Sequence, residues 1–310
     1  MRLGMLDVGS NTVHLLVVDA DAGARPVPAA KQRTELRLLD FFVDGDHLSD
    51  EGRRRLVEVI NEAHEESRRL GVEDLAAFAT SALREAANAD DVLAEVRERT
   101  GIDLHILDGD DEARLTFLAA RRWFGWSAGR LLLIDIGGGS LELAIGLDEV
   151  PDHVASFPLG ESRLTRDWLT DDPPTPEEVR ALDAHVRQVV AQRIRPFALD
   201  TGIDHAVGTS KTLRSLARVT GVAPYDEGPY VRRVLSLTDT RQILEKVADM
   251  KAKERAKLPG VSASRAEHLV AGALVAVTAM ELLGVEELVI CPWALREGVI
   301  LTRLDWLTVA

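Results

Sequence analysis

Hydrophobic and polar positions predict a β-hairpin in the middle of the chain. Residues 131–136 are mostly apolar, three consecutive glycines and a serine follow, and an alternating apolar and polar run resumes at 141–145. An apolar run, a glycine-rich turn and an alternating run are typical of two antiparallel strands. A dinucleotide-binding or Walker-type loop would need a helix directly after the glycines, and no helical pattern follows here.

The same pattern occurs near the start of the chain. Residues 7–15 align with residues 135–143 so that an aspartate, a glycine, a hydroxyl residue and a final leucine coincide. Each copy is entered by one apolar strand and left by another. Two hairpins with the same chemistry predict a duplicated fold whose two turns face each other.

The segments around these hairpins alternate between strand and helix patterns. Residues 75–79 and 104–107 read as strands, and residues 89–100 between them read as a helix closed by Gly101. A further helix is expected from residue 113 to about residue 122. This alternation predicts an α/β fold. A capping box with a proline in the first turn, residues 175–178, opens a further helix that we expect to stop near Pro196.

The two glycine turns are candidate phosphate-binding loops. Glycines allow backbone N–H groups to close on an anion, and carboxylates beside the turn supply hard oxygen ligands for a divalent cation. Two such loops would hold an oligophosphate from two sides. The alternative is a pair of glycine-rich turns without a ligand. The candidate phosphate-binding residues are Gly9, Ser10, Asn11 and Thr12 in the first turn and Gly137, Gly138, Gly139 and Ser140 in the second, and the carboxylates of the second are Asp135 and Glu142.

Charge limits the partners and shows what a phosphate site would need. The formal net charge is −14, which argues against duplex nucleic acid because non-specific binding to it depends on a basic surface. The same charge repels polyphosphate unless cations and a metal lie close to the site.

Two positions supply such cations. Arg84 follows a predicted strand, and its alternative role is a surface ion pair with Glu85 or another neighbour. A second predicted strand is followed by a turn at a helix N-terminus, which is a natural binding position for an anion. This turn comprises Gly208, Thr209, Ser210 and Lys211.

Length and composition describe an ordinary globular protein. The 310 residues suffice for two domains, and 46% hydrophobic and 28% charged residues are usual values. The first strand follows Met1 without a signal-peptide pattern, and the apolar helix pattern near 269–283 is interrupted by polar residues and glycine. The single cysteine, Cys291, lies in an apolar run and is expected in the core. We therefore expect a cytoplasmic protein without a membrane or nucleic-acid partner.

Six motifs resemble those of the exopolyphosphatase and guanosine pentaphosphate phosphohydrolase (Ppx/GppA) family, within the actin, sugar kinase and Hsp70 superfamily. They occur in the order of that family along nearly the whole chain and are most similar to the short actinobacterial exopolyphosphatases. The motifs are residues 7–14, 79–84, 112–115, 135–140, 208–212 and 295–298.

This resemblance implies an α/β fold of two ribonuclease H-like domains facing each other across a cleft. The N-terminal actin-like domain would comprise residues 1–124 with a returning C-terminal helix at 292–310, and the second would comprise residues 125–291. The resemblance makes Glu112 the catalytic residue; its alternative role is to face the dipole at a helix start. It also associates Asp135 and Glu142 with Mg²⁺, with Mn²⁺ as the alternative metal and Asp7 as a helper.

Three departures from the family pattern accompany the resemblance. Asp111 stands where many members have a glutamate, and Leu141 replaces a threonine. The chain ends soon after residues 296–298, without the helical C-terminal domain of longer members. We therefore expect an exopolyphosphatase that releases terminal orthophosphate by metal-assisted water attack and favours short chains.

Three other functions fit parts of the pattern. The same loops would serve hydrolysis of guanosine pentaphosphate (pppGpp), an alarmone of the stringent response, although no residue marks a guanine pocket. An ATP-dependent kinase of the same superfamily would need an adenosine pocket and an acceptor site. A non-catalytic polyphosphate or nucleotide sensor would act through a partner protein. The family also allows a homodimer.

Overall fold

The computed structural model describes residues 1–20, 27–198 and 202–309, and the chain divides into two compact units. Unit 1 comprises Met1–Leu115 and Leu295–Ala310, and unit 2 comprises Thr116–Ala294. The division falls within helix α4 (Gly109–Phe124). The two units are described separately below.

Unit 1 is built on a five-stranded sheet with the order β3-β2-β1-β6-β7. Strand β1 pairs antiparallel with β2 and parallel with β6, so a three-stranded meander continues into parallel strands. The strands are β1 (Arg2–Val8), β2 (Thr12–Asp19), β3 (Pro28–Glu35), β6 (Asp74–Ala79) and β7 (His105–Ile106), and a separate pair is formed by β4 (Phe42–Val43) and β5 (His47–Leu48). The helices of this unit are η1 (Leu38–Phe41), α1 (Asp50–Arg69), α2 (Ser81–Arg84), α3 (Ala89–Thr100) and α13 (Leu295–Val309).

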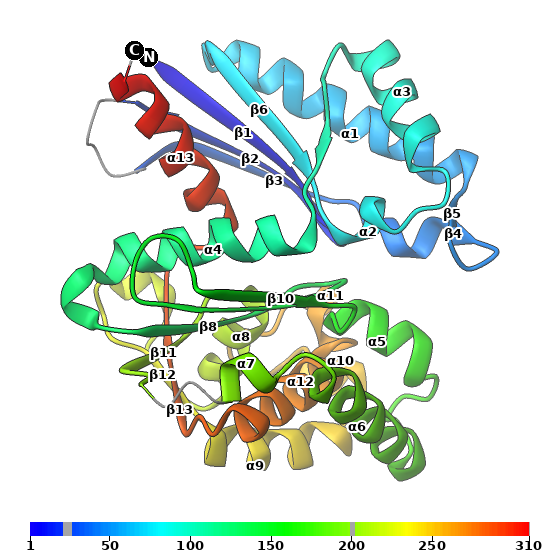
Figure 1. The fold of residues 1–310 in the computed structure, drawn as a ribbon. Helices are drawn as coiled ribbons and strands as arrows, with labels where there is room; N and C mark the ends of the chain where they lie inside the picture. Colours follow the sequence, from blue (N-terminus) through cyan, green and yellow to red (C-terminus); the bar gives the residue numbers. More distant parts are fainter. Residues whose placement is uncertain (21–26, 199–201, 310) are drawn as a thin grey trace. The chain divides into compact units, whose positions relative to one another are not determined.

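Helices cover both faces of this sheet (Figure 1). Successive side chains of a strand point to opposite faces, and β1 is apolar on both of them. Leu6 and Val8 join the core cluster that contains α1 and α3, whereas Leu3 and Met5 pack with residues of α13. The C-terminal helix therefore completes the hydrophobic core of unit 1.

Unit 2 repeats this arrangement with a six-stranded sheet of order β10-β9-β8-β11-β13-β12. A meander of three antiparallel strands again continues into parallel ones. The strands are β8 (Leu131–Ile136), β9 (Leu141–Gly146), β10 (His153–Phe157), β11 (His205–Gly208), β12 (Val234–Ser236) and β13 (Glu287–Ile290). The predicted α/β class with two ribonuclease H-like domains is confirmed.

One helix of unit 2, α12 (Leu269–Leu283), is almost entirely buried and packs on α5, α6, α8 and α9. The second half of α4 covers the opposite face of the sheet, where Phe117 and Ala120 pack with Leu131 and the buried Cys291. The remaining helices are η2 (Trp126–Ala128), α5 (Glu161–Trp168), α6 (Pro176–Ala191), α7 (Arg195–Ala198), α8 (Lys211–Val219), η3 (Tyr225–Glu227), α9 (Leu237–Ala248), α10 (Ala252–Arg255) and α11 (Ala263–Ala266).

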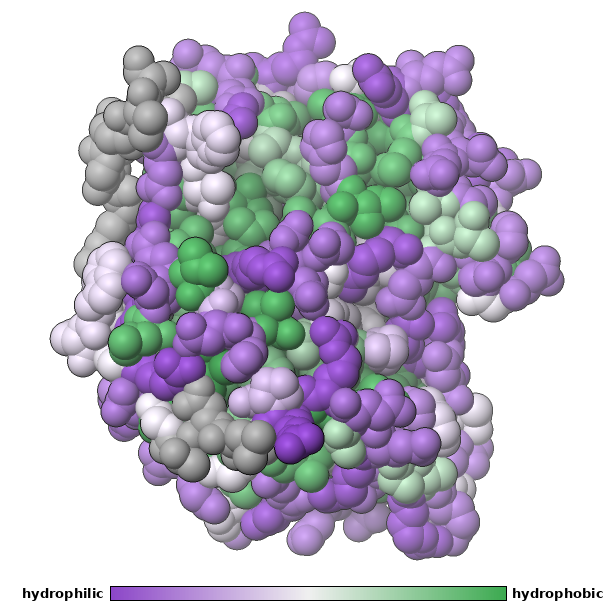
Figure 2. All heavy atoms as spheres, in the orientation of Figure 1, coloured by the Kyte–Doolittle hydropathy of each residue, from purple (hydrophilic) through white to green (hydrophobic). Residues whose placement is uncertain are grey.

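The surface is mainly polar, as expected for a globular protein of ordinary composition. Hydrophilic residues cover most of the face drawn in Figure 2. None of the described helices combines the length and the apolarity that a membrane span requires.

The predicted capping box of α6 is present. The Thr175 hydroxyl accepts the N–H of Glu178, and the Glu178 carboxylate accepts the N–H of Thr175 at 2.7 Å. Burial raises the pKa of Glu178, but hydrogen bonds from Thr170 and Thr175 outweigh it and lower the pKa to about 2. The helix ends at Ala191, earlier than the predicted stop near Pro196.

Replacing Glu178 by Gln is expected to destabilise the protein at neutral pH by about 1 kcal/mol, the usual value of a helix cap. The folded pKa lies below the unfolded one, so the charged carboxylate stabilises the fold above about pH 4.5 and loses this effect as the pH falls towards 2. Urea unfolding of both proteins between pH 7 and 3 measures the difference, which should shrink with acidification. Glu177→Gln, which removes the charge of the exposed neighbouring glutamate, is the control.

Candidate active site

The first glycine turn lies in unit 1 between β1 and β2. The N–H of Gly9 donates to the carbonyl of Thr12 at 3.0 Å, which closes the turn. The Ser10 carbonyl accepts the N–H of Leu38, and the buried Ser10 hydroxyl lies 3.2 Å from the hydroxyl of Ser81 at the start of α2. The turn is therefore fixed to the end of β6 as well as to its own hairpin.

Arg84 and Glu112 lie together in unit 1. Arg84 ends α2, Glu112 lies in the first turn of α4, and Nη1 of Arg84 is 3.1 Å from Oε2 of Glu112. The same Nη1 donates to the carbonyl of Leu107 at 2.9 Å. The side chains are 19% and 14% exposed, so a cation and a carboxylate share one half-buried position. Arg84 is thus paired with Glu112 at a half-buried position, whereas the alternative role predicted for it was an ion pair on the surface.

The start of α4 explains how Glu112 is placed. The predicted helix begins at 113, whereas α4 begins at Gly109 because the Asp108 carboxylate accepts the N–H of Asp111 at 2.6 Å. Glu112 therefore stands within the first turn rather than before it. An acidic residue there also interacts favourably with the helix dipole.

Asp7 lies beside a cation of its own unit. It pairs in register with His14 across the hairpin, and its Oδ2 lies 3.9 Å from Nε of Arg296. Arg296 belongs to the last motif of the chain and lies on α13. The returning helix thus brings a guanidinium to the first hairpin.

The second glycine turn lies in unit 2 and repeats the geometry of the first. The N–H of Gly137 donates to the carbonyl of Ser140 at 2.8 Å. The carbonyls of Gly137 and Gly138 accept N–H groups from the first turn of α5, and the Gly139 carbonyl accepts Nε of Arg163. In the described part of the chain, the N–H groups of Gly138 and Gly139 meet no acceptor. With its carbonyls bound, the turn presents its amides, as an anion site requires.

The second glycine turn packs against a further glycine, Gly160, which lies outside the six sequence motifs. A Cβ at Gly160 would lie 2.3 Å from backbone atoms of Gly139 and 2.4 Å from the carbonyl carbon of Gly138. Only a residue without a side chain lets α5 approach the turn so closely. Gly160 directly precedes helix α5, but no local sequence pattern indicates that it contacts the glycine turn.

Gly160→Ala is expected to displace the glycine turn and to reduce orthophosphate release from polyphosphate about 10²-fold, the usual effect of losing one aligned donor. The reason is steric, because rigid backbone must move to admit the methyl group. Phosphate release at saturating and limiting substrate would measure the effect. Asp167→Ala, which changes an exposed side chain on the same helix, is the control, and equal rates for both variants would contradict this role.

Asp135 and Glu142 pair directly across the strands β8 and β9. Residues directly opposite each other in an antiparallel pair point to the same face of the sheet. The hydroxyl of Thr209 donates to Asp135, and the hydroxyl of Ser156 donates to Glu142 at 3.0 Å. Glu142 is 2% exposed and Asp135 is half-buried, so Asp135 is the more accessible carboxylate.

This oxygen-rich set fits a hard divalent cation. Mg²⁺ is commonly held by one or two carboxylates together with substrate phosphates and water, and Asp135 with Glu142 supplies that number. Within residues 1–20, 27–198 and 202–309 there is no group of three or more His, Cys, Asp or Glu side chains arranged for a metal. Asp7, the predicted helper, belongs to the other unit.

The turn after β11 also matches its prediction. Ser210 caps α8, because its hydroxyl accepts the N–H of Leu213 at 3.1 Å, and Lys211 is the first residue of the helix. Thr209 is fully buried and bonded to Asp135. The structure thus brings Asp135, Glu142, Thr209 and the second glycine turn together in unit 2.

A buried ion pair that sequence analysis missed lies behind these groups. Glu161 of α5 accepts Nη1 of Arg265 at 2.7 Å, and their side chains are 3% and 17% exposed. The Thr212 hydroxyl lies 2.9 Å from both Glu161 and the carbonyl of Ile136. We call Glu161, Arg265 and Thr212 the buried triad. It connects the start of α5, whose N–H groups bind the glycine turn, to the start of α8, which carries Lys211.

Comparison with known proteins identifies the family of this protein. The model of the Ppx/GppA phosphatase family matches residues 16–306, and the chain belongs to this family. Exopolyphosphatase 1 of Mycobacterium tuberculosis is 50% identical over 305 residues, which cover 98% of this chain and 89% of that protein. A guanosine-5'-triphosphate,3'-diphosphate pyrophosphatase of Aliivibrio fischeri is 26% identical over 300 residues, covering 97% of this chain and 59% of that protein.

Solved structures share the fold over the full length. A crystal structure of an exopolyphosphatase from Cytophaga hutchinsonii superposes with a TM-score of 0.88 at 23% identity and covers 98% of both chains. The Aquifex aeolicus member of the Ppx/GppA family gives a TM-score of 0.81 at 25% identity, again with 98% of both chains covered. The ribonuclease H-like architecture described above is thus that of the family.

Proposed function

We propose that this protein is an exopolyphosphatase that releases terminal orthophosphate from inorganic polyphosphate. The observation that carries the proposal is the half-buried pair of Arg84 and Glu112, a cation beside a carboxylate that can accept a proton. The 50% identity to proteins named exopolyphosphatase 1 supports the same substrate class.

In this proposal unit 2 holds the phosphate chain. The amides of Gly138 and Gly139 and the ammonium group of Lys211 bind non-bridging oxygens, and Ser210 orients the start of α8. Asp135 and Glu142 would hold Mg²⁺ or Mn²⁺. When bound, the metal neutralises charge on the phosphoryl oxygens.

Unit 1 supplies the remaining groups. Arg84 binds an oxygen of the terminal phosphoryl group, and the first turn from Gly9 to Thr12 adds backbone and hydroxyl donors. Glu112 orients the attacking water and takes its proton as a general base. Phosphoryl transfer depends mainly on such positioning and charge neutralisation, because little covalent chemistry is left to the protein.

Purified protein incubated with Mg²⁺ and polyphosphates of defined length tests the proposal. We expect stepwise release of orthophosphate that stops when EDTA is added and returns with Mg²⁺ or Mn²⁺. Rates of orthophosphate release from polyphosphates of increasing length would test the expected preference for short substrates. Binding of polyphosphate without any turnover would contradict the proposal and favour a sensor.

Hydrolysis of pppGpp is the second candidate, because the Aliivibrio fischeri relative with 26% identity is named for a guanosine phosphate substrate. Comparing kcat/KM for polyphosphate and pppGpp in one preparation separates the two activities. A higher kcat/KM for pppGpp would make it the preferred substrate.

A further inference from the structure

A row of four oxygen-bearing side chains crosses the sheet of unit 2. Ser156 of β10 lies directly opposite Glu142 of β9, and Glu142 lies directly opposite Asp135 of β8. Residues paired in this way point to the same face of a sheet. Thr209 follows β11, the strand on the other side of β8, and its N–H donates to the carbonyl of Ile134 at 3.4 Å. The order along the row is therefore hydroxyl, carboxylate, carboxylate, hydroxyl.

Each hydroxyl at an end of the row donates to the carboxylate next to it. The Ser156 hydroxyl lies 3.0 Å from Oε1 of Glu142, and the Thr209 hydroxyl donates to Oδ2 of Asp135. Thr209 is fully buried, and Ser156 is half-buried. Hydrogen bonds to a charged acceptor are stronger than those between neutral groups. Both carboxylates are therefore held in a fixed orientation by a group on a neighbouring segment.

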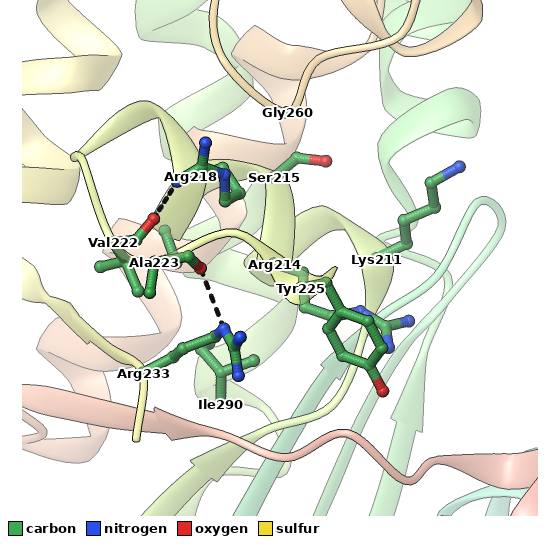
Figure 3. Close-up of a pocket in the computed structure, with 11 residues that line it drawn as sticks. Lys211, Arg214, Ser215, Arg218, Val222, Ala223, Tyr225, Arg233, Gly260 and Ile290 are labelled. Atoms are coloured by element: carbon green, nitrogen blue, oxygen red, sulfur yellow. Dashed lines mark hydrogen bonds between the residues drawn. The ribbon is translucent and has the colours of Figure 1, made fainter. Parts of the chain in front are cut away.

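The turn that contains Thr209 continues into α8, which contributes cations to a different feature of unit 2. One face of α8 lines a pocket of about 350 Å³ with Lys211, Arg214 and Arg218. Figure 3 shows the Lys211 side chain extending from the start of the helix away from Arg218. Replacing Thr209 therefore changes the hydrogen bonding of Asp135 without removing any of these cations.

The number of oxygens that each carboxylate offers distinguishes Mg²⁺ from Ca²⁺. Ca²⁺ takes more oxygen ligands than Mg²⁺ and often binds a carboxylate through both of its oxygens. Mg²⁺ requires a nearly octahedral set and keeps several waters, and Mn²⁺ also suits an octahedron of oxygens. When one carboxylate oxygen accepts a hydrogen bond from a buried hydroxyl, binding a metal through both oxygens would disrupt that hydrogen bond.

We propose that Thr209 and Ser156 are positioning residues that make the carboxylate pair selective for Mg²⁺ over Ca²⁺. Each hydroxyl engages one oxygen of its carboxylate, so the carboxylate binds a metal through its other oxygen. This mode suits Mg²⁺ and withholds from Ca²⁺ the two-oxygen contacts that it favours. The inference rests on the proposed function, which assigns a metal to Asp135 and Glu142, and it extends that function by naming the residues that select the metal.

Titration of the full chain with Mn²⁺, followed by the electron paramagnetic resonance signal of the unbound ion, tests the proposal. Displacement of Mn²⁺ by Mg²⁺ and by Ca²⁺ gives their Kd values, and we expect the wild type to bind Ca²⁺ most weakly. Thr209→Val keeps the shape of the side chain but removes the donor. It should weaken Mn²⁺ binding about tenfold, the usual effect of losing an outer hydrogen-bond partner, and leave Ca²⁺ binding unchanged.

Ser156→Ala repeats the test at the other end of the row, and the ratio of the Ca²⁺ Kd to the Mn²⁺ Kd should fall in both variants. Thermal melting checks folding, and Ser156→Ala decides the outcome if the buried Thr209→Val does not fold. Thr209→Ser retains a hydroxyl and should keep the wild-type ratio. Thr220→Val is the matched control, because the Thr220 hydroxyl donates to the carbonyl of Ala217 at 2.7 Å at the other end of α8.

A merely structural role would change the Mn²⁺ and Ca²⁺ Kd values by the same factor. An unchanged ratio in the folded variants would therefore overturn the proposal, and so would a wild type that does not bind Mn²⁺ or that binds Ca²⁺ more tightly. Orthophosphate release from polyphosphate is measured separately on the wild type. Absent hydrolysis together with the expected shift in ratio would refute the proposed function and leave the metal selectivity supported.

Discussion

Glu112→Gln is expected to lower the rate of orthophosphate release from polyphosphate by about 10²- to 10⁴-fold, the usual contribution of a general base. Glutamine has the same shape and its amide oxygen still accepts a hydrogen bond from Arg84, so the half-buried site should keep its geometry. It cannot take a proton from the attacking water. Phosphate release measures the loss, and titration with polyphosphate should still show binding.

Asp111→Asn is the matched control for this variant. Asp111 precedes Glu112 in the same helical turn, is exposed and pairs with Arg114 at 2.8 Å on the surface. Removing its charge should change the rate less than about twofold, because exposed ion pairs contribute little. A Glu112→Gln protein with full turnover would remove Glu112 as the base and leave it the role of an acidic residue at a helix start.

Arg265→Met is expected to reduce the free energy of unfolding by about 3–5 kcal/mol, because it leaves the Glu161 carboxylate buried without its counter-charge. Methionine keeps much of the aliphatic volume of arginine, so the effect reports on charge rather than on a cavity. Urea unfolding followed by circular dichroism measures it. Since Glu161 and Thr212 position the glycine turn and α8, polyphosphate binding should weaken in the same variant.

The double variant Glu161→Gln with Arg265→Met distinguishes the effect of the lost ion pair from the effect of altered side-chain packing. Removing both charges should restore a large part of the lost stability, because no uncompensated charge then stays buried. Arg241→Met is the control, since Arg241 pairs with Glu281 at 2.8 Å at an exposed position and should cost less than about 1 kcal/mol. Equal losses for Arg265→Met and the control would show that the buried triad does not support the site.

Most of the fold could be predicted from local patterns. The two hairpins and the capping box at Thr175 were confirmed, because turn glycines, alternation and caps act over a few residues. The start of α4 was predicted four residues too late, since the capping role of Asp108 depends on one side-chain hydrogen bond. Helix ends of this kind are set by single contacts rather than by periodicity.

The candidate site was predicted less completely. The motif residues Asp135, Gly137 and Thr209 could be chosen because they lie at or just after the ends of predicted strands, where binding residues are often found. Gly160, Glu161 and Arg265 gave no comparable signal, because each acts on residues far from it in the chain. The face of α8 formed by Lys211, Arg214 and Arg218 has a helical spacing that a search for basic stripes would have detected.

The sequence by itself determined that the chain contains two copies of one hairpin with a glycine turn, because that information lies in contiguous residues. Only the tertiary structure decided that Arg84 pairs with Glu112, that Gly160 admits the second glycine turn and that a pocket opens beside α8. These contacts join segments separated by 20 to 70 residues or more, and their geometry follows from how helices pack on the sheets.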